Sequence, residues 1–198
     1  MDRRIKNLCK RAQSADKSAA CELLEIYHPD VFAYLRRLCG NRQDAEDLTQ
    51  QTFLKVWSSL DRFVGRSEFS TWLYRIAHNT YVDGRRRGPG GARHYPDPWW
   101  NECIDTNPGP FADVADRQMA QRLYEAVDQL DDDKKHVVHL HYYQQLSLRQ
   151  TAQVLNVTVS TVKYRLREVL TILRIRLGVE ENEANAARTT PVVKGETT

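Results

Sequence analysis

Three residues near the C-terminus have the types and the spacing of a helix-turn-helix. Ala152 is small, as a residue must be where the two helices cross, and Asn156, four residues later, tolerates the left-handed backbone of the turn. Val162, ten residues after Ala152, is placed to pack beneath the second helix. The second helix of such a unit enters the major groove of DNA with its N-terminal residues at the base edges. The pattern therefore predicts binding to duplex DNA.

The exposed side chains of this unit carry hydroxyl groups and positive charges. Hydroxyl groups suit base edges, and cations suit phosphates. The residues expected to contact DNA are Arg149, Ser160, Thr161, Lys163, Tyr164 and Arg167. Thr158 is expected to cap the second helix, because its hydroxyl oxygen accepts hydrogen bonds from unpaired backbone N–H groups. The alternative is a plain helical hairpin whose charges are only solvated.

A second stretch, residues 66–87, combines aromatic side chains with arginines. This mixture suits single-stranded DNA, since bases stack on rings at about 1–3 kcal/mol each and cations follow the phosphates. One helix face is predicted to be core instead: Phe69, Trp72, Leu73 and Ile76. The residues off that face, which remain candidates for DNA contacts, are Tyr74, Arg75, Asn79, Arg85, Arg86 and Arg87.

Charge is distributed unevenly along the chain, although the formal net charge is only +3. Residues 62–94 contain seven arginines against one glutamate and one aspartate, and residues 158–177 contain five basic residues against one glutamate. Two separate basic segments indicate a polyanionic partner. Ordinary solvated helix faces are the alternative interpretation.

No arrangement typical of catalysis or of a metal centre is evident in the sequence. The four cysteines form no CxxC pair and have no zinc spacing. His136, His139 and His141 invite a metal-sensor or enzyme hypothesis, and the first two share a helix face, but no carboxylate or cysteine completes a ligand set. We therefore expect no enzymatic activity, no cofactor and no metal.

The N-terminal sequence is charged and is followed by no apolar run, so no signal peptide is expected. No segment approaches the roughly 18–20 apolar residues that span a bilayer. We expect no membrane insertion, reduced thiols and a cytoplasmic location.

Apolar residues recur at helical spacing through most of the chain, and strand patterns are almost absent. Helices are predicted over residues 16–39, 44–62, 69–86, 114–130, 134–144, 148–155 and 159–177. Pro29 should end or kink the first of these, because proline lacks a backbone N–H. Gly40 and Asn41 should separate the first helix from the second.

Residues 88–110 contain five of the seven prolines and four of the nine glycines, which predicts a flexible linker. The expected fold class is therefore all-α, with two small helical domains. The expected boundaries are a helical domain at 1–87, the linker at 88–112, a second helical domain at 113–178 and a disordered tail at 179–198.

Together these segments resemble the extracytoplasmic-function sigma factors of bacterial RNA polymerase. Residues 44–57, DAEDLTQQTFLKVW, are similar to the polymerase-binding segment of the sigma-2 domain. Residues 69–87, FSTWLYRIAHNTYVDGRRR, are similar to the promoter-melting segment that follows it, and the helix-turn-helix is similar to that of the sigma-4 domain. The chain departs from the family pattern at His78, where arginine is usual, and at Asn156, where glycine is usual.

The resemblance implies a protein that carries polymerase core to particular promoters and helps to open them. It implies a core-binding surface at Asp44, Glu46, Asp47, Gln50, Gln51 and Trp57. It implies contacts to single-stranded minus-ten DNA at Val64, Gly65, Arg66, Ser67, Tyr74, Arg75, Asn79, Arg85 and Arg86. The helix-turn-helix residues would read the minus-thirty-five element as duplex.

The resemblance also implies an anti-sigma factor, expected to be membrane-bound, that holds the protein inactive. The rival hypothesis is an autonomous helix-turn-helix regulator. That hypothesis explains residues 147–177 but leaves the segment 44–87 without a role, and no dimerisation heptad supports it.

Overall fold

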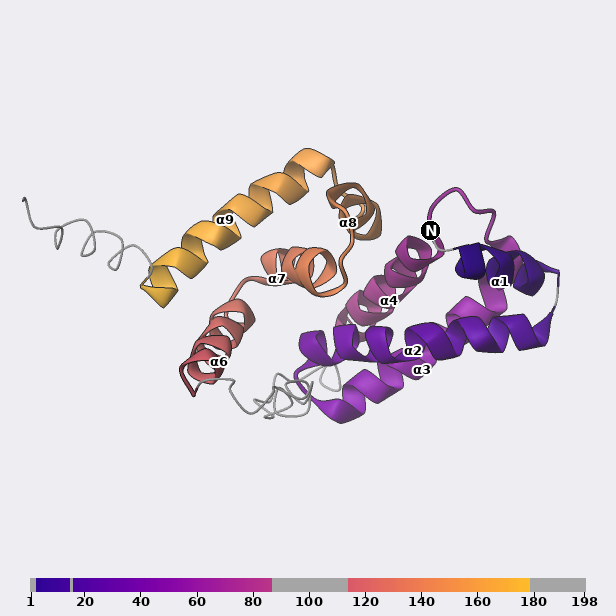
Figure 1. Ribbon diagram of the computed structural model, residues 1–198, viewed down its shortest axis with the longest axis horizontal. Coiled ribbons are helices and arrows are strands. Elements are labelled where there is room, and N and C mark those ends of the chain that lie inside the picture. The colour runs from indigo at the N-terminus through magenta and orange to yellow at the C-terminus, as the bar shows by residue number, and fades with distance from the viewer. Residues whose placement is uncertain (1–2, 15, 87–113, 179–198) are drawn as a thin grey trace, which may run out of the picture.

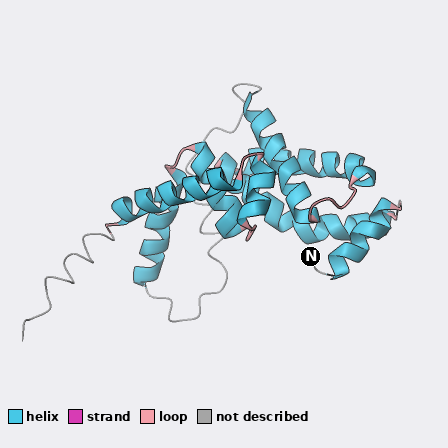
Figure 2. Cartoon of the chain, turned by 90° about the horizontal axis from the view of Figure 1, so that it is seen from above, coloured by secondary structure: helices cyan, strands magenta, loops and turns pink. Residues whose placement is uncertain are grey.

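The structure is a computed structural model that describes residues 3–14, 16–86 and 114–178, with the backbone alone for 114–117. Within these ranges every regular element is helical and no strand occurs (Figure 2). The elements are α1 (Arg3–Gln13), α2 (Lys17–Cys39), α3 (Arg42–Ser59), η1 (Leu60–Arg62), α4 (Phe69–Arg86), α6 (Val114–Asp128), α7 (Asp132–Val138), η2 (His139–Tyr143), α8 (Leu148–Leu155) and α9 (Val159–Leu177). The all-α prediction is confirmed, whereas the predicted linker at 88–112 and tail at 179–198 lie outside the described residues.

The first four α-helices pack around one apolar core. Figure 1 shows α2 and α3 running alongside each other, with α1 against α2 and α4 against α3. Leu23, Leu35, Val56 and Leu73 are fully buried between them. Because burying one such side chain contributes about 1.5–3 kcal/mol, the helical spacing of apolar residues is enough to explain how this half assembles.

Local signals separate α2 from α3 as predicted. Gly40 ends α2 in the left-handed conformation with φ 74°, which favours glycine. Asn41 then caps α3, since its side-chain oxygen accepts a hydrogen bond from the backbone N–H of Asp44 at 2.8 Å. Pro29, by contrast, lies inside α2 and does not end it, because the helix continues to Cys39.

The helix-turn-helix forms where its spacing predicted. Ala152, Val162 and Leu166 are buried together with Val137, so that α7, α8 and α9 share one apolar cluster. Asn156 takes the left-handed conformation, with φ 53° and ψ 45°, that the turn requires.

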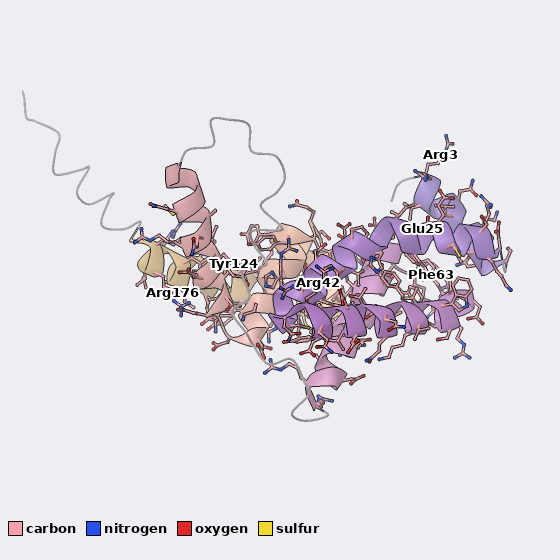
Figure 3. The ribbon with its side chains drawn as sticks, turned by 90° about the horizontal axis from the view of Figure 1, so that it is seen from below. Arg3, Glu25, Arg42, Phe63, Tyr124 and Arg176 are labelled. Carbon is pink, nitrogen blue, oxygen red and sulfur yellow. The ribbon has the colours of Figure 1, made fainter. Side chains whose placement is uncertain are left out.

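Polar caps fix the ends of its two helices. Ser147 and Gln150 form a reciprocal capping box at the start of α8. The hydroxyl of Thr158 accepts a hydrogen bond from the backbone N–H of Thr161 at 3.1 Å and so caps α9, as predicted. At the far end of α9, Arg176 donates to the carbonyl of Ala126 at 2.8 Å and holds α9 against α6 (Figure 3).

The two helical halves lie against each other. α8 packs on α4 and η2 packs on α2, so that segments far apart in the sequence lie side by side (Figure 1). Leu140, Leu146 and Val154 of the C-terminal half are buried in the apolar cluster of α1–α4. The sequence pattern predicted the two halves but not this contact.

Candidate polymerase and nucleic-acid interfaces

An open apolar groove of about 740 Å³ lies between α2 and α3. Its apolar lining is Leu24, Phe32, Phe53, Leu54 and Trp57. Leu54 is 62% exposed and Trp57 is 44% exposed, which is unusual for large apolar side chains next to one another. Glu25 of α2 and Arg42 of α3, both labelled in Figure 3, belong to its polar rim. This combination of an apolar floor and a polar rim suits the binding of a protein helix.

The groove includes part of the core-binding surface expected from the sequence. Glu46, Gln50 and Trp57 line it. Asp47 and Gln51 are exposed on α3 but do not line it. Asp44 is half-buried, and its carboxylate accepts a hydrogen bond from the side-chain amide of Asn41 at 2.7 Å.

Apart from Trp57, the apolar part of this surface was not predicted from the sequence. Phe32, Phe53 and Leu54 were not among the expected residues, although 53, 54 and 57 are spaced to lie close together on one helix surface. That spacing was the available signal. It did not distinguish side chains that face the core from those that remain exposed at a groove.

The loop before α4 carries the first part of the expected minus-ten surface. Val64 is 71% exposed, Gly65 and Arg66 are exposed, and Ser67 is half-buried. Gly65 has φ 69°, and a Cβ placed on it would meet no atom within 4 Å, so backbone conformation rather than space favours glycine here. The loop is thus free to contact a ligand.

Two residues of α4 expected to contact DNA are engaged by the C-terminal half instead. Tyr74 was predicted to lie off the buried face, but it is only 3% exposed. The ring of Tyr34 packs edge-on against the ring of Tyr74, and the hydroxyl of Tyr74 donates to Oε1 of Gln144. Arg75 is exposed, but its Nε and Nη2 both donate to the backbone carbonyl of Gln153, at 3.1 Å and 2.8 Å.

The remaining expected residues of α4 lie farther along the helix. Asn79 and Arg86 are exposed. Arg85 forms an ion pair with Asp132 of α7 and also donates to the hydroxyl of Tyr81 at 3.3 Å. Since a helix rises 1.5 Å per residue, the set from position 74 to position 86 extends over about 18 Å.

His78, which stands where the family usually has arginine, is half-buried. Its ring meets the ring of His136 edge to face, with 4.6 Å between the centroids. Burial lowers the pKa of His78 to about 4 and that of His136 to about 3, because the charged imidazolium would lose its hydration. Both rings are therefore neutral near pH 7.

The recognition helix α9 presents its expected side chains on one surface. Ser160, Lys163, Tyr164 and Arg167 are exposed at helical spacing, above the buried Val162. Tyr164 is 61% exposed, and its hydroxyl donates to Glu168 at 2.9 Å, which raises the pKa of the phenol.

The other two residues of the helix-turn-helix that were expected to contact DNA do not belong to this exposed row. Thr161 is half-buried, and its hydroxyl lies 2.8 Å from that of the capping Thr158. Arg149 is exposed at the start of α8, where it is available to a phosphate.

The three histidines that raised the metal hypothesis have different surroundings. His136 packs on His78, His139 packs on the ring of Tyr143 with 5.3 Å between centroids, and Nδ1 of His141 lies 2.7 Å from the carbonyl of Leu146. Among the described residues, no group of three potential metal ligands comes together.

Comparison with known proteins relates both halves to one family. Residues 23–88 match sigma-70 region 2, and residues 120–173 match sigma-70 region 4. The chain is 28% identical over 189 residues to the ECF RNA polymerase sigma factor SigW of Bacillus subtilis, covering 89% of this chain and 98% of that protein. It is 30% identical over 176 residues to the ECF RNA polymerase sigma-E factor of Haemophilus influenzae, covering 82% and 91%.

Solved structures have the same fold. CnrH, in complex with the cytosolic domain of CnrY, superposes with a TM-score of 0.66 at 23% identity, covering 89% of this chain and 98% of that chain. The sigma factor RpoE of Bartonella quintana, in complex with the anti-sigma factor NepR, superposes with a TM-score of 0.59 at 23% identity, covering 80% and 96%. In the part of the chain that the structure describes, no helix is long and apolar enough to cross a membrane.

Proposed function

This chain belongs to the sigma-70 family, as an extracytoplasmic-function sigma factor of bacterial RNA polymerase, and from this premise we propose which surface binds each partner. As a sigma factor it is not an enzyme: it directs polymerase core to promoters and assists their opening. We assign residues 1–87 to a sigma-2 domain and residues 113–178 to a sigma-4 domain, joined by a linker at 88–112.

The groove between α2 and α3 is the proposed site for polymerase core. Its floor of Phe53, Leu54 and Trp57 offers apolar surface to a partner helix, and large aromatic residues in such positions commonly dominate binding energy. Glu46, which pairs with Arg42, and Asp47, which is exposed beside the groove, give α3 an acidic edge, which favours a basic partner and speeds association.

The recognition helix α9 is the proposed reader of duplex DNA at the minus-thirty-five element. The single observation that carries this assignment is the exposed row Ser160, Lys163, Tyr164 and Arg167 above a fully assembled helix-turn-helix core. Hydroxyl and cationic groups in that row can donate to base edges and phosphates. Arg149 adds a phosphate contact from the preceding helix.

The loop 64–67 and the outer side of α4 form the proposed minus-ten surface. Asn79, Arg85 and Arg86 follow the loop along one helix, so that a displaced single strand would run parallel to α4. A base held out of the stack by the loop would offset part of the cost of separating the strands. No catalytic step by this chain is required.

Each DNA contact buries little surface, so neither half should bind a promoter tightly alone. Attachment of both halves to one polymerase raises the effective concentration of each near its own element. Promoter specificity then results from two weak contacts made together.

We further propose that an anti-sigma factor holds the protein inactive in the cytoplasm. The sigma factor RpoE was captured with such a partner, and the same kind of regulation is expected here. A membrane-bound anti-sigma factor that hides the groove between α2 and α3 would block access to core.

Run-off transcription tests the proposed function directly. Purified core polymerase is incubated with a genomic promoter library, with or without this chain. Products that start at a shared motif only when the chain is present support the assignment and define both promoter elements. Absence of products, together with protection of duplex DNA by the chain alone, would favour the autonomous regulator.

A further inference from the structure

The exposed side of α1 is basic along the whole helix. The residues that face the core are buried in the apolar cluster of the N-terminal half: Ile5, Leu8, Cys9 and Ala12. The opposite side consists of exposed polar side chains: Arg3, Lys6, Asn7 and Lys10. Arg3 projects away from the bundle at the N-terminal end of the helix (Figure 3). Because α1 contains no acidic residue, this side presents an uninterrupted positive surface.

Two lysines at the centre of this basic side are not neutralised. Lys6 and Lys10 lie about one helical turn apart, and within the described ranges neither pairs with a carboxylate. Lysines that no carboxylate neutralises attract a polyanion. The basic side of α1 is therefore a candidate binding surface.

The basic side of α1 leads to the loop before α4. Gln13 lies one turn beyond Lys10 on the same edge of the helix, and its Nε2 donates to the backbone carbonyl of Phe63, the residue before the loop. α1 also packs on η1, from which the loop leaves (Figure 1). Arg62 and Arg66, at the two ends of this stretch, are exposed. The cations of α1 and of the loop thus form one continuous surface.

We propose that the basic side of α1 binds the phosphates of the displaced single strand where that strand leaves the loop on the side away from α4. The proposal rests on the assignment of the loop to minus-ten DNA. The match to sigma-70 region 2 begins at residue 23, so α1 lies outside the segment that the family match covers. A strand whose base is held by the loop is already unpaired there, and cations can follow its backbone.

The strand that meets α1 is downstream of the minus-ten element. The end of α4 at Arg86 precedes the linker to the sigma-4 domain, which is assigned to the upstream element. DNA that runs from that end along α4 to the loop reaches α1 only after the minus-ten element. Since phosphate contacts carry no sequence information, α1 should hold this strand whatever its bases are.

A lipid surface is the other anionic partner that a basic helix can bind. The apolar side chains of α1 are buried in the core, so they are not available to enter a bilayer. A few cations alone attract a membrane only weakly. Continuity with the loop therefore favours DNA.

The test measures binding of forked promoter DNA to the holoenzyme formed from core polymerase and this chain, by fluorescence anisotropy. The promoter is one defined by run-off transcription. The strand that the loop binds ends either directly after the minus-ten element or about ten nucleotides farther downstream. Because core polymerase contributes equally to every variant, the comparison between variants reports the contribution of α1.

Lys6→Gln combined with Lys10→Gln removes two charges from the basic side. We expect this double variant to bind the extended probe about tenfold more weakly than the parent at about 50 mM salt, and the short probe equally well. Both side chains are exposed, so folding is not at risk.

The matched control is Arg4→Gln combined with Arg11→Gln. It removes two charges from the same helix, but from side chains that already form ion pairs with Glu22 at 2.6 Å and Asp16 at 2.8 Å. We expect the control to bind the extended probe within about twofold of the parent.

The salt dependence distinguishes phosphate contacts from a change in folding. Each phosphate that a single strand loses as a contact makes the slope of log affinity against log salt shallower by about 0.7. Two lost contacts should therefore change the slope by about 1.4. The difference in affinity between the parent and the double variant should then shrink about sevenfold between about 50 mM and about 200 mM salt.

The proposal is overturned if the double variant binds the extended probe as tightly as the parent, if the control loses as much, or if the short probe is weakened equally. Vesicles that contain phosphatidylserine are the second probe. Their binding by the parent but not by the double variant, with unchanged binding of the extended DNA, would assign the surface to lipid instead. A parent holoenzyme that does not bind even the short probe refutes the proposed function.

Discussion

Acidification from about pH 7.5 to about pH 5 should open the contact between the two halves, because the half-buried His78 and the buried His136 meet there as neutral rings. The two rings meet with 4.6 Å between their centroids, and no hydrogen-bond partner reaches Nδ1 of either ring. The charged groups around them are Arg85 on α4, Asp133 and Lys135 on α7, and Arg165 on α9. Arg85, Lys135 and Arg165 oppose protonation of His136, whereas Asp133 favours that of His78.

The loss of stability of the contact on acidification follows from the difference in histidine pKa between the exposed and the buried rings. An exposed histidine has a pKa of about 6.5, whereas burial lowers the pKa to about 4 for His78 and to about 3 for His136. The form in which the two halves are in contact thus binds fewer protons than a form in which they are apart below about pH 6.5, and the stability of the contact falls as the pH falls. At about pH 5 the loss is about 2 kcal/mol for each ring that opening exposes. The loss levels off only below the pKa values of the buried rings.

The assay is energy transfer between dyes on the exposed Cys21 and on a thiol introduced at the exposed position 171 by Thr171→Cys, recorded as a function of pH. Cys103→Ser removes a competing thiol. The parent should show a distance that increases between about pH 6.5 and about pH 5. A double variant, His78→Gln with His136→Gln, should lose this dependence, whereas His28→Gln, at an exposed ring in the groove, should keep it. An unchanged distance in the parent down to about pH 5, or an identical response in the double variant, would refute the reasoning.

Lys163→Ala combined with Arg167→Ala should abolish promoter-specific run-off transcription, because both cations lie on the exposed row of α9. The affinity of this double variant for core polymerase should stay unchanged. A parallel loss of core binding would contradict the assignment of DNA binding and core binding to separate surfaces. Trp57→Ala should weaken core binding at least about tenfold, since a large aromatic side chain in a groove often contributes about 2 kcal/mol or more, as titration of labelled core can measure. Asp47→Lys should also weaken core binding by placing a cation against a basic partner, and an unchanged dissociation constant would argue against the acidic edge. Asn156→Ala should lower the free energy of unfolding, measured by urea titration, by about 1–2 kcal/mol, because alanine is strained in the left-handed turn. Asn156→Gly should leave this free energy nearly unchanged.

Local sequence signals predicted the helix-turn-helix well, because its geometry depends on residues close together in the chain. Ala152, Asn156 and Val162 lie within one short segment, and each requirement acts on a single residue type. Thr158 caps α9 for the same reason. The helices of the N-terminal half followed from the spacing of apolar residues, which is likewise a local property.

Long-range contacts could not be predicted in the same way. Tyr74 looks like a surface residue from the pattern of its own helix, but the ring of Tyr34 on α2 packs against it and Gln144, 70 residues away, accepts its hydrogen bond. The surroundings of His78 could not be predicted for the same reason, because its partner His136 lies in the C-terminal half of the chain. Phe53 was not predicted to line a groove. An apolar residue on a helix can face either the core or an exposed groove, and the spacing of apolar residues does not distinguish these two positions.

The partners that close over α4 are synthesised long after α4 itself. Gln153, which accepts the hydrogen bonds of Arg75, follows it by 78 residues. At translation rates of about 5–20 residues per second, the ribosome needs about 4–16 s to add this stretch. Every new molecule therefore passes through a stage in which α4 has been made but its cover has not. During that interval a nascent chain exposes the surface that the finished chain conceals.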